Sequence, residues 1–382
     1  MPSSSGQSGS AGSSAAQGGS ETQDAPDGGN VRTPLTWKVL ATSLDSKLNA
    51  NPPSAASRGR DAGVAYVEYS DTMPPTARVV MQRFDASGEQ VGSLAALGSE
   101  ADRFSDVSLA SDGKQYAACW TFNLEVHCSL VDEQGQVQLN AVEFDGQYPT
   151  LVASPSGWAI GYTISGAQLR LQALTPALEL NGSPVDLQQS ARFQGARLGP
   201  LLTPVPSGFA LVGAKSADEH EGLLRLDADL QPLGDATPLG RDFWMSGQLV
   251  ASDTRAAVSL SVAYGSFLLL LDAHQVTAEL PVAGGGKAGM DHALVLTQGG
   301  IGAAWLDGVA EARRRFFADG HDAEIGLETH DNPSTAIGLP EEGIESYQQL
   351  LQVADRTLLV ARQTRSGSLA NAPIRVATLT FP

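Results

Sequence analysis

GVAYVEY, residues 63–69, is the stretch that decides the fold, because short apolar segments like it recur along the rest of the chain. The further copies are QYAACWTF (115–122), GWAIGYT (157–163), GFALVGA (208–214), RAAVSLSV (255–262), GIGAAWL (300–306) and RTLLVAR (356–362). A recurrence about every 50 residues, with several short strands in each unit, is the sequence signature of a repeat architecture.

Each copy is flanked by further strand-like segments. A shorter apolar run comes before it, as in DVSLASD (106–112), and an alternating run comes after it, as in ARVVMQRFD (77–85) and LEVHCSLVD (124–132). The alternating runs lead into turns, and a weaker fourth run such as QVQLNAVEF (136–144) follows. The turns are DASG (85–88), DEQG (132–135), DADL (227–230) and ADGH (318–321). Asp and Gly suit hairpin turns because Asp caps the local backbone and Gly accepts positive φ.

Four strands in each repeat predict an all-β fold, a β-propeller with one four-stranded antiparallel blade per unit. The seven copies predict seven blades, and a miscount of one weak repeat would give six or eight. The last unit ends at its third strand, IRVATLTF (374–381), and an unassigned strand-like segment, TWKVLATSL (36–44), precedes the first unit. We therefore expect the N-terminal strand to pair with the last blade and close the ring, which removes an exposed sheet edge.

The repeats in residues 36–382 resemble the divergent seven-bladed propellers of bacterial secreted proteins and lipoproteins. They lack the Trp-Asp endings of WD40 blades, the paired glycines of kelch repeats and the S-x-D-x-G-x-T-W box of sialidases. The resemblance implies an exported protein of the periplasm, outer membrane or cell surface.

Residues 1–34 differ in composition from the predicted propeller domain, residues 35–382. The first thirty residues contain eight Ser and seven Gly. Such a segment cannot bury enough apolar surface to fold, so we expect a disordered tether. It lacks the features of a signal peptide. It resembles the stretch that follows the lipidated cysteine of bacterial lipoproteins, which implies a lipid anchor missing from this chain; an ordinary disordered terminus is the alternative.

Charge and hydropathy exclude some partners. The formal net charge of −18 repels phosphate backbones, so nucleic acid is not expected as a partner. No run approaches the length of a membrane span, so direct membrane insertion is not expected either.

The two cysteines, Cys119 and Cys128, lie on successive predicted strands around a centre at Asn123 and Leu124. A two-residue turn there places Cys119 directly opposite Cys128 in a non-hydrogen-bonded pair, where side chains are closest. This pairing predicts a disulfide and favours an oxidising compartment. Two free buried thiols are the alternative.

The connectors that enter successive blades repeat a pairing of Arg with an aromatic residue, and Tyr148 occupies a similar place in a further connector. Arg and aromatic residues are enriched at binding hot spots, so these residues are candidates for a partner-binding face. The alternative is that each ring packs between blades under its own Arg. The candidates are Arg103, Phe104, Arg192, Phe193, Arg241, Phe243 and Trp244.

No catalytic motif, cofactor fingerprint or metal-ligand spacing is present, and the six histidines are scattered. The acidic segments at 218–221 and 319–324 are interpreted as solvated turns, although their carboxylates could hold a hard cation.

We expect a non-enzymatic binding or scaffold protein of the cell envelope with a protein or glycan partner and no cofactor. The alternatives are a propeller-type glycoside hydrolase or lyase with carboxylates at the pore mouth, and a structural subunit of a larger envelope assembly.

Overall fold

The computed structural model describes a set of ranges within the chain. They are residues 38–39, 47–48, 53–70, 76–99, 101, 106–164, 168–190, 200–215, 221–240, 246–262, 265–281, 292–297, 300–307, 311–318, 335–337, 345–362 and 374–379. The chain divides into two compact units, residues 1–31 and 32–382, and every described residue lies in the second. The predicted tether therefore lies outside the described residues.

All regular elements in these ranges are β-strands, and all their pairings are antiparallel. Three successive four-stranded blades are formed by residues 107–238. They contain β7 (Val107–Ser111), β8 (Tyr116–Phe122), β9 (Glu125–Val131) and β10 (Val137–Asp145); β11 (Gln147–Ser154), β12 (Gly157–Ile164), β13 (Gln168–Leu174) and β14 (Leu180–Ser190); β15 (Leu201–Val205), β16 (Gly208–Lys215), β17 (Glu221–Leu226) and β18 (Thr237–Pro238).

Three further four-stranded blades follow, and the last of them takes its outer strand from the start of the chain. They contain β19 (Ser246–Ala251), β20 (Ala256–Val262), β21 (Gly265–Leu271) and β22 (Val276–Pro281); β23 (His292–Thr297), β24 (Gly300–Asp307), β25 (Glu311–Ala318) and β26 (Thr335–Ile337); β27 (Glu345–Val353), β28 (Arg356–Arg362), β29 (Ile374–Leu379) and β1 (Lys38–Val39).

The prediction of seven four-stranded blades is wrong. Six sheets are four-stranded blades, whereas the first sheet in the chain has five strands: β2 (Lys47–Leu48), β3 (Ser54–Ser57), β4 (Asp61–Ser70), β5 (Thr76–Asp85) and β6 (Gln90–Gly98). Both β2 and β3 pair with β4, through Leu48↔Glu68 and Ser54↔Ala65. The inner edge of this sheet is therefore made of two short strands, and the sequence between them contains consecutive prolines, which cannot donate to a strand ladder.

The first and last described strands pair with each other. Lys38 lies opposite Val376 and Val39 lies opposite Arg375, so β1 completes the sheet of β27–β29. The pairing occupies two residues of the expected strand at 36–44. It joins the two ends of the second unit and covers the edge of β29.

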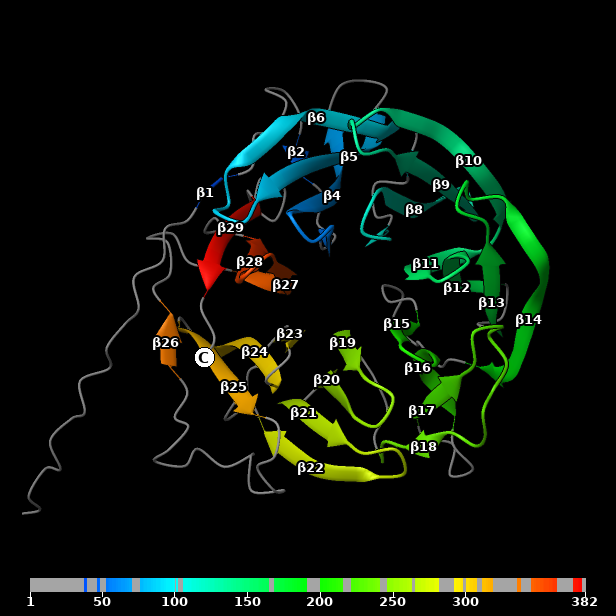
Figure 1. Ribbon diagram of the computed structural model, residues 1–382, viewed down its shortest axis with the longest axis vertical. Helices are drawn as coiled ribbons and strands as arrows, with labels where there is room; N and C mark the ends of the chain where they lie inside the picture. The colour runs from blue at the N-terminus through cyan, green and yellow to red at the C-terminus, as the bar shows by residue number, and fades with distance from the viewer. Residues whose placement is uncertain are drawn as a thin grey trace, which may run out of the picture. The chain divides into compact units, whose positions relative to one another are not determined.

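The inner strands contact one another in a closed cycle, and the sheets extend outward from it (Figure 1). The order of contact is β3, β7, β11, β15, β19, β23, β27 and back to β3. Apolar clusters fill the spaces between neighbouring sheets, with Trp120 and Tyr116 between the five-stranded sheet and the β7–β10 blade, and Trp158 between that blade and the next. The core is therefore a set of layers between sheets.

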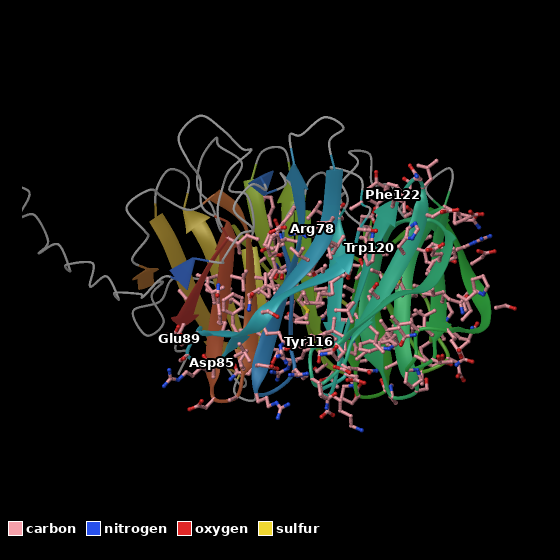
Figure 2. The ribbon with its side chains drawn as sticks, turned by 90° about the horizontal axis from the view of Figure 1, so that it is seen from above. Arg78, Asp85, Glu89, Tyr116, Trp120 and Phe122 are labelled. Carbon is pink, nitrogen blue, oxygen red and sulfur yellow. A yellow bond between two sulfur atoms is a disulfide. The ribbon has the colours of Figure 1, made fainter. Side chains whose placement is uncertain are left out.

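The ring of described strands has two distinct faces. The ends of the outermost strands and the starts of the next innermost strands lie at one end, which we call the connector face, together with Phe122 at the end of β8 (Figure 2). Asp85 and Glu89 lie at the opposite end, the turn face, where short hairpins join the first to the second and the third to the fourth strands.

The hairpins of the turn face follow the predicted Asp-capped pattern. Asp85 Oδ1 accepts hydrogen bonds from the backbone N–H groups of Ser87 and Glu89, and Asp132 and Asp227 cap equivalent turns. These contacts confirm the turns predicted at DASG, DEQG and DADL, whereas most of ADGH lies outside the described residues.

Two hairpin turns of the turn face, residues 175–178 and 227–230, place Leu where the turns at 85–88 and 132–135 have Gly. Leu178 and Leu230 have φ of 63° and are almost fully buried, whereas Gly88 and Gly135 have φ of 77° and 85°. Burying a leucine contributes about 1.5–3 kcal/mol. This gain offsets the cost of the left-handed conformation, which is about 1–3 kcal/mol.

A buried ionic cluster joins the five-stranded sheet to the β7–β10 blade. Arg58 binds Asp61 through two hydrogen bonds of 2.9 and 2.7 Å, and Arg58 Nη1 donates to the backbone carbonyl of Lys114 at 3.1 Å. The Tyr116 hydroxyl donates to Asp61 at 2.9 Å. Burial, and then the Asp61 carboxylate, raise the pKa of Tyr116 far above its ordinary value, so it remains a donor at neutral pH. The side chains of Arg58 and Asp61 are only 2% and 7% exposed, and Arg83 Nη1 lies 3.7 Å from the Asp61 carboxylate as a second, longer ion pair. Arg58 therefore supplies the closest compensation of the buried Asp61 charge.

Arg58→Met is expected to lower the free energy of unfolding by about 3–5 kcal/mol, because it removes both Arg58 hydrogen bonds from the buried Asp61 carboxylate and leaves it only the Tyr116 hydroxyl and Arg83 at 3.7 Å. Urea unfolding measures the change, and Arg60→Met, at an exposed neighbouring position, is the control. The double variant Arg58→Met with Asp61→Leu should recover much of the loss. A loss below about 1 kcal/mol in the single variant would contradict the coupling.

Candidate functional site

The predicted binding residues lie outside the described residues. Arg103 and Phe104 fall between β6 and β7, Arg192 and Phe193 between β14 and β15, and Arg241, Phe243 and Trp244 between β18 and β19. Each of these segments links an outermost strand to the next innermost strand, so the flanking strand ends lie at the connector face. Their role in binding stays a prediction.

The β8–β9 hairpin is described in full and carries the predicted crosslink. Cys119 lies directly opposite Cys128 in the ladder and is joined to it by a disulfide, with 4.1 Å between the Cα atoms. Both cysteines are fully buried. The disulfide prediction and its register are confirmed, and the alternative of two free thiols is excluded.

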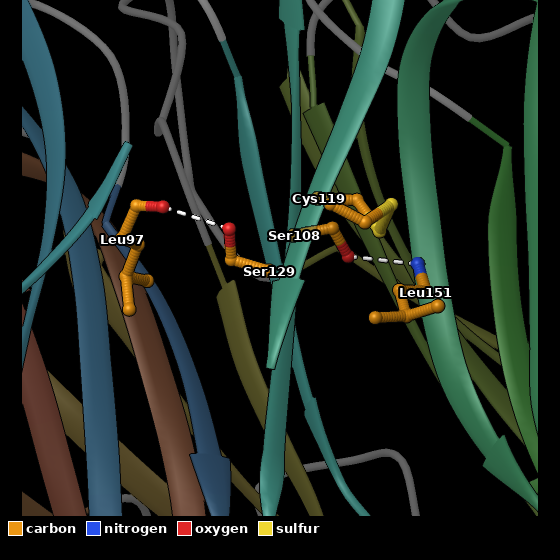
Figure 3. The surroundings of a disulfide bond; sticks show 6 residues. Leu97, Ser108, Cys119, Ser129 and Leu151 are labelled. Atoms are coloured by element: carbon orange, nitrogen blue, oxygen red, sulfur yellow. Dashed lines mark hydrogen bonds between the residues drawn. A yellow bond between two sulfur atoms is a disulfide. The ribbon is translucent and has the colours of Figure 1, made fainter. Parts of the chain in front are cut away.

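Hydrogen bonds join the disulfide-bearing blade to both of its neighbours (Figure 3). Ser129 Oγ donates to the backbone carbonyl of Leu97 at 2.7 Å, on the side of the five-stranded sheet. On the other side, the backbone N–H of Leu151 donates to Ser108 Oγ at 2.8 Å. The hairpin is thus crosslinked by a covalent bond, and the blade that contains it is hydrogen-bonded to both neighbouring sheets.

The tip of this hairpin exposes an apolar side chain on a strained backbone. Asn123 and Leu124 have φ of 51° and 69°, as in the two-residue turns of β-hairpins. Such turns usually have Gly at the second position, but Leu124 stands there and is 67% exposed. A non-glycine residue in this region costs about 1–3 kcal/mol, and here no burial of the side chain offsets it.

The connector between β10 and β11 is bonded to the same tip. Gly146 N donates to the Leu124 carbonyl at 3.0 Å, and Tyr148 N donates to Thr121 Oγ1 at 3.1 Å. Tyr148 itself has φ of 52°. Three of the six non-glycine residues with positive φ in the described ranges therefore meet here. We call Thr121, Asn123, Leu124, Gly146 and Tyr148 the corner site.

The corner site is next to a central cavity of about 340 Å³, because Pro149, the residue after Tyr148, lines that cavity together with Asp106. Burial, and then the charge of Asp106, raise the pKa of Tyr148 above its ordinary value.

The cavity is lined by the inner strands of all the sheets. Its walls combine apolar and polar surface in nearly equal parts, with leucines at Leu109, Leu151 and Leu294 among others and polar side chains that include Ser54, Ser108, Thr150, Gln248 and Gln349. Asp106 is the one charged residue among the described residues that line it. The described lining therefore supplies one carboxylate, whereas glycoside hydrolysis uses a pair.

His127 forms an aromatic cluster on the face of the hairpin opposite Cys128. Its ring lies 6.1 Å from that of Trp120 and 5.8 Å from that of Phe122, between centroids, and its Nδ1 lies 3.2 Å from the Glu143 carboxylate. Cys128 packs instead in the cluster that contains Trp158. The side chains of His127 and Cys128 therefore point to opposite faces of the hairpin.

The interpretation of residues 218–221 as a solvated turn is wrong for Glu221. This residue begins β17, lies opposite Lys215 and is only 2% exposed, because the β16–β17 ladder extends to it and Leu239 N donates to its carbonyl at 2.9 Å. Residues 216–220 lie outside the described residues.

Within the described ranges, no group of three or more His, Cys, Asp or Glu side chains is arranged to hold a metal ion, and no helix is long and apolar enough to cross a membrane.

Neither a protein-family model nor a curated protein sequence matches this chain. The fold is similar to that of the Dos1 propeller, with 11% identity, a TM-score of 0.51 and coverage of 90% of this chain and 95% of that one. It is also similar to the β-propeller domain of Cps50 (Swd1) from Myceliophteria thermophila, with 11% identity, a TM-score of 0.52 and coverage of 91% and 99%. At such identities the likeness establishes the β-propeller fold alone.

Sequence reasoning identified Tyr148 and the disulfide, but it missed Leu124 as an exposed residue. A signal was present, because Leu occupies the second position of a two-residue turn that is otherwise typical of Asn-Gly. Asp106 was placed at the start of an inner strand, but its position on the cavity depends on how all the sheets close into a ring.

Replacing both cysteines (Cys119→Ala, Cys128→Ala) is expected to lower the free energy of unfolding by roughly 2–3 kcal/mol, because the bond constrains a short loop in the unfolded chain. Denaturant unfolding with and without reductant measures this loss. Reductant should lower the midpoint of the wild type and leave that of the double variant unchanged. Alkylation of two thiols in the unreduced, unfolded wild type would contradict the crosslink.

Proposed function

We propose that this protein is a non-enzymatic binding propeller of the bacterial cell envelope that engages a protein or glycan partner with its connector face. The observation that carries the proposal is Leu124, an exposed apolar side chain in a left-handed conformation at the tip of a disulfide-linked hairpin. Strained backbone conformations cluster at functional sites, where the cost is retained for a role other than stability.

The arrangement of the corner site supports binding by a preorganised surface. The disulfide and the hydrogen bonds from Gly146 and Tyr148 hold the tip in place. A partner that buries Leu124 would therefore gain apolar contact without ordering a loop. Apolar surface of this kind favours a protein partner over a glycan.

The location in the envelope is supported by the disulfide, since such bonds persist in oxidising compartments. The periplasm, the outer membrane surface and the cell surface all meet this condition. The resemblance to secreted and lipoprotein propellers supports the same location. The proposal includes an N-terminal lipid anchor that holds the protein at the envelope.

Binding is favoured over glycoside hydrolysis by the composition of the cavity. Hydrolysis requires two carboxylates about 5–10 Å apart. The described lining contributes Asp106 alone, and its other polar groups are hydroxyls and amides.

Leu124→Gly is expected to abolish capture of the partner while leaving the fold intact or slightly more stable, by up to about 1 kcal/mol, because Gly adopts positive φ without strain. The measurement is a pulldown from envelope extract with the full chain, with thermal unfolding in parallel. Leu233→Gly is the matched control, since Leu233 is 59% exposed and lies in the β17–β18 connection at the turn face.

A second variant tests the predicted connector residues by changing Arg192, Phe193, Arg241, Phe243 and Trp244 to Ala. Loss of the same partner in both variants would place these connectors and the corner site on one binding surface. Equal recovery of that partner by wild type and by the folded Leu124→Gly variant would contradict the role of the corner site.

A further inference from the structure

The central cavity has features of a ligand site that is separate from the corner site. Its volume of about 340 Å³ falls within the range of small-molecule pockets. Its walls combine apolar and polar surface in nearly equal parts, and its described lining has one carboxylate and no basic side chain. Such a lining selects for a ligand with a positive charge.

The inner strands show how polar groups at this cavity are normally satisfied. Each inner strand is the edge of its sheet, so alternate backbone N–H groups point away from the ladder toward the axis. Side-chain oxygens from the preceding sheet accept three of these groups. Ser54 Oγ accepts from Leu109 N at 2.9 Å, Ser108 Oγ from Leu151 N at 2.8 Å, and Gln248 Oε1 from Leu294 N at 2.9 Å.

Gln349 departs from this pattern. Like Gln248, it lines the cavity and precedes a leucine on an inner strand, and its strand β27 contacts β3 of the next sheet. Its Oε1 is buried, yet it has no hydrogen-bond partner among the described residues. A buried amide oxygen without a partner is unfavourable, so a donor supplied by a ligand would stabilise it.

We propose that the cavity binds a small organic cation, with an ammonium or guanidinium head stabilised by the Asp106 carboxylate and N–H groups that donate to Gln349 Oε1. The apolar walls contributed by Leu109, Leu151 and Leu294 contact the aliphatic part of the ligand. The formal net charge of −18 attracts cations to the protein and raises their local concentration. This inference goes beyond the proposed partner binding and does not depend on it.

Titration calorimetry of the full chain with butylammonium and with agmatine tests the proposal, with 1-butanol and butyrate as neutral and anionic counterparts. At least one of the two cations should bind saturably, whereas the counterparts should not. Asp106→Asn is expected to weaken binding about tenfold or more, because it removes the charge, and Gln349→Leu about fivefold, because it removes one acceptor.

Asp229→Asn, in an exposed turn of the turn face, is the matched control and should bind as the wild type does. Thermal unfolding identifies variants that remain folded, and Gln349→Leu keeps the test decisive if Asp106→Asn does not fold. Absence of saturable binding of both cations to the wild type up to about 10 mM would overturn the proposal. Equal weakening in Asp229→Asn, or equal binding of 1-butanol, would also overturn it. Leu124→Gly should bind the cations normally, which separates this site from the corner site.

Discussion

Face-to-face packing between neighbouring sheets is the constraint on which the rest of the structure depends. Each sheet is apolar on both faces, so it is stable only when a neighbour lies on each side. Trp120 illustrates the requirement, because it extends from β8 into the cluster shared with the five-stranded sheet, while Cys119 on the same strand faces the opposite neighbour. A row of such sheets has two unsatisfied ends until it closes, and the pairing of β1 with β29 and the contact of β27 with β3 remove those ends.

Closure of the ring leaves the inner strands as unpaired sheet edges around its axis. The inner strands leave backbone groups directed at the cavity, and the chain satisfies them with side chains from neighbouring sheets at Ser54, Ser108 and Gln248. Pro53 and Pro149 line the same cavity. Proline has no backbone N–H, so these two positions leave no donor that needs a partner. The turn face is held in a similar way, since Arg58 and Arg225 both donate to backbone carbonyls of turns in the adjacent sheet. The ring is thus fixed along its axis and at one face, which leaves the connector face available for function.

The sequence predicted the features that depend on local pattern. The strand periods, the Asp-capped turns and the register of Cys119 with Cys128 follow from alternation and turn chemistry, which act over a few residues. The division of the first sheet's inner edge into β2 and β3 was not predicted, because a pair of prolines in sequence does not show whether pairing resumes beyond it. The burial of Glu221 was missed because composition alone does not show how far a ladder extends. Leu124 was missed although its place in a two-residue turn is a local signal, whereas the orphaned oxygen of Gln349 depends on three-dimensional closure, which sequence spacing does not encode.

The central claim is that the corner site at the connector face contacts a partner in the envelope. Site-specific photo-crosslinking in intact bacterial cells tests it most directly, with the reactive side chain placed at position 124 and, as a control, at position 233 on the turn face. The account predicts a discrete adduct of higher mass from position 124 and none from position 233. Adducts of equal yield from both positions, or none from position 124 in cells that export the protein, would contradict it.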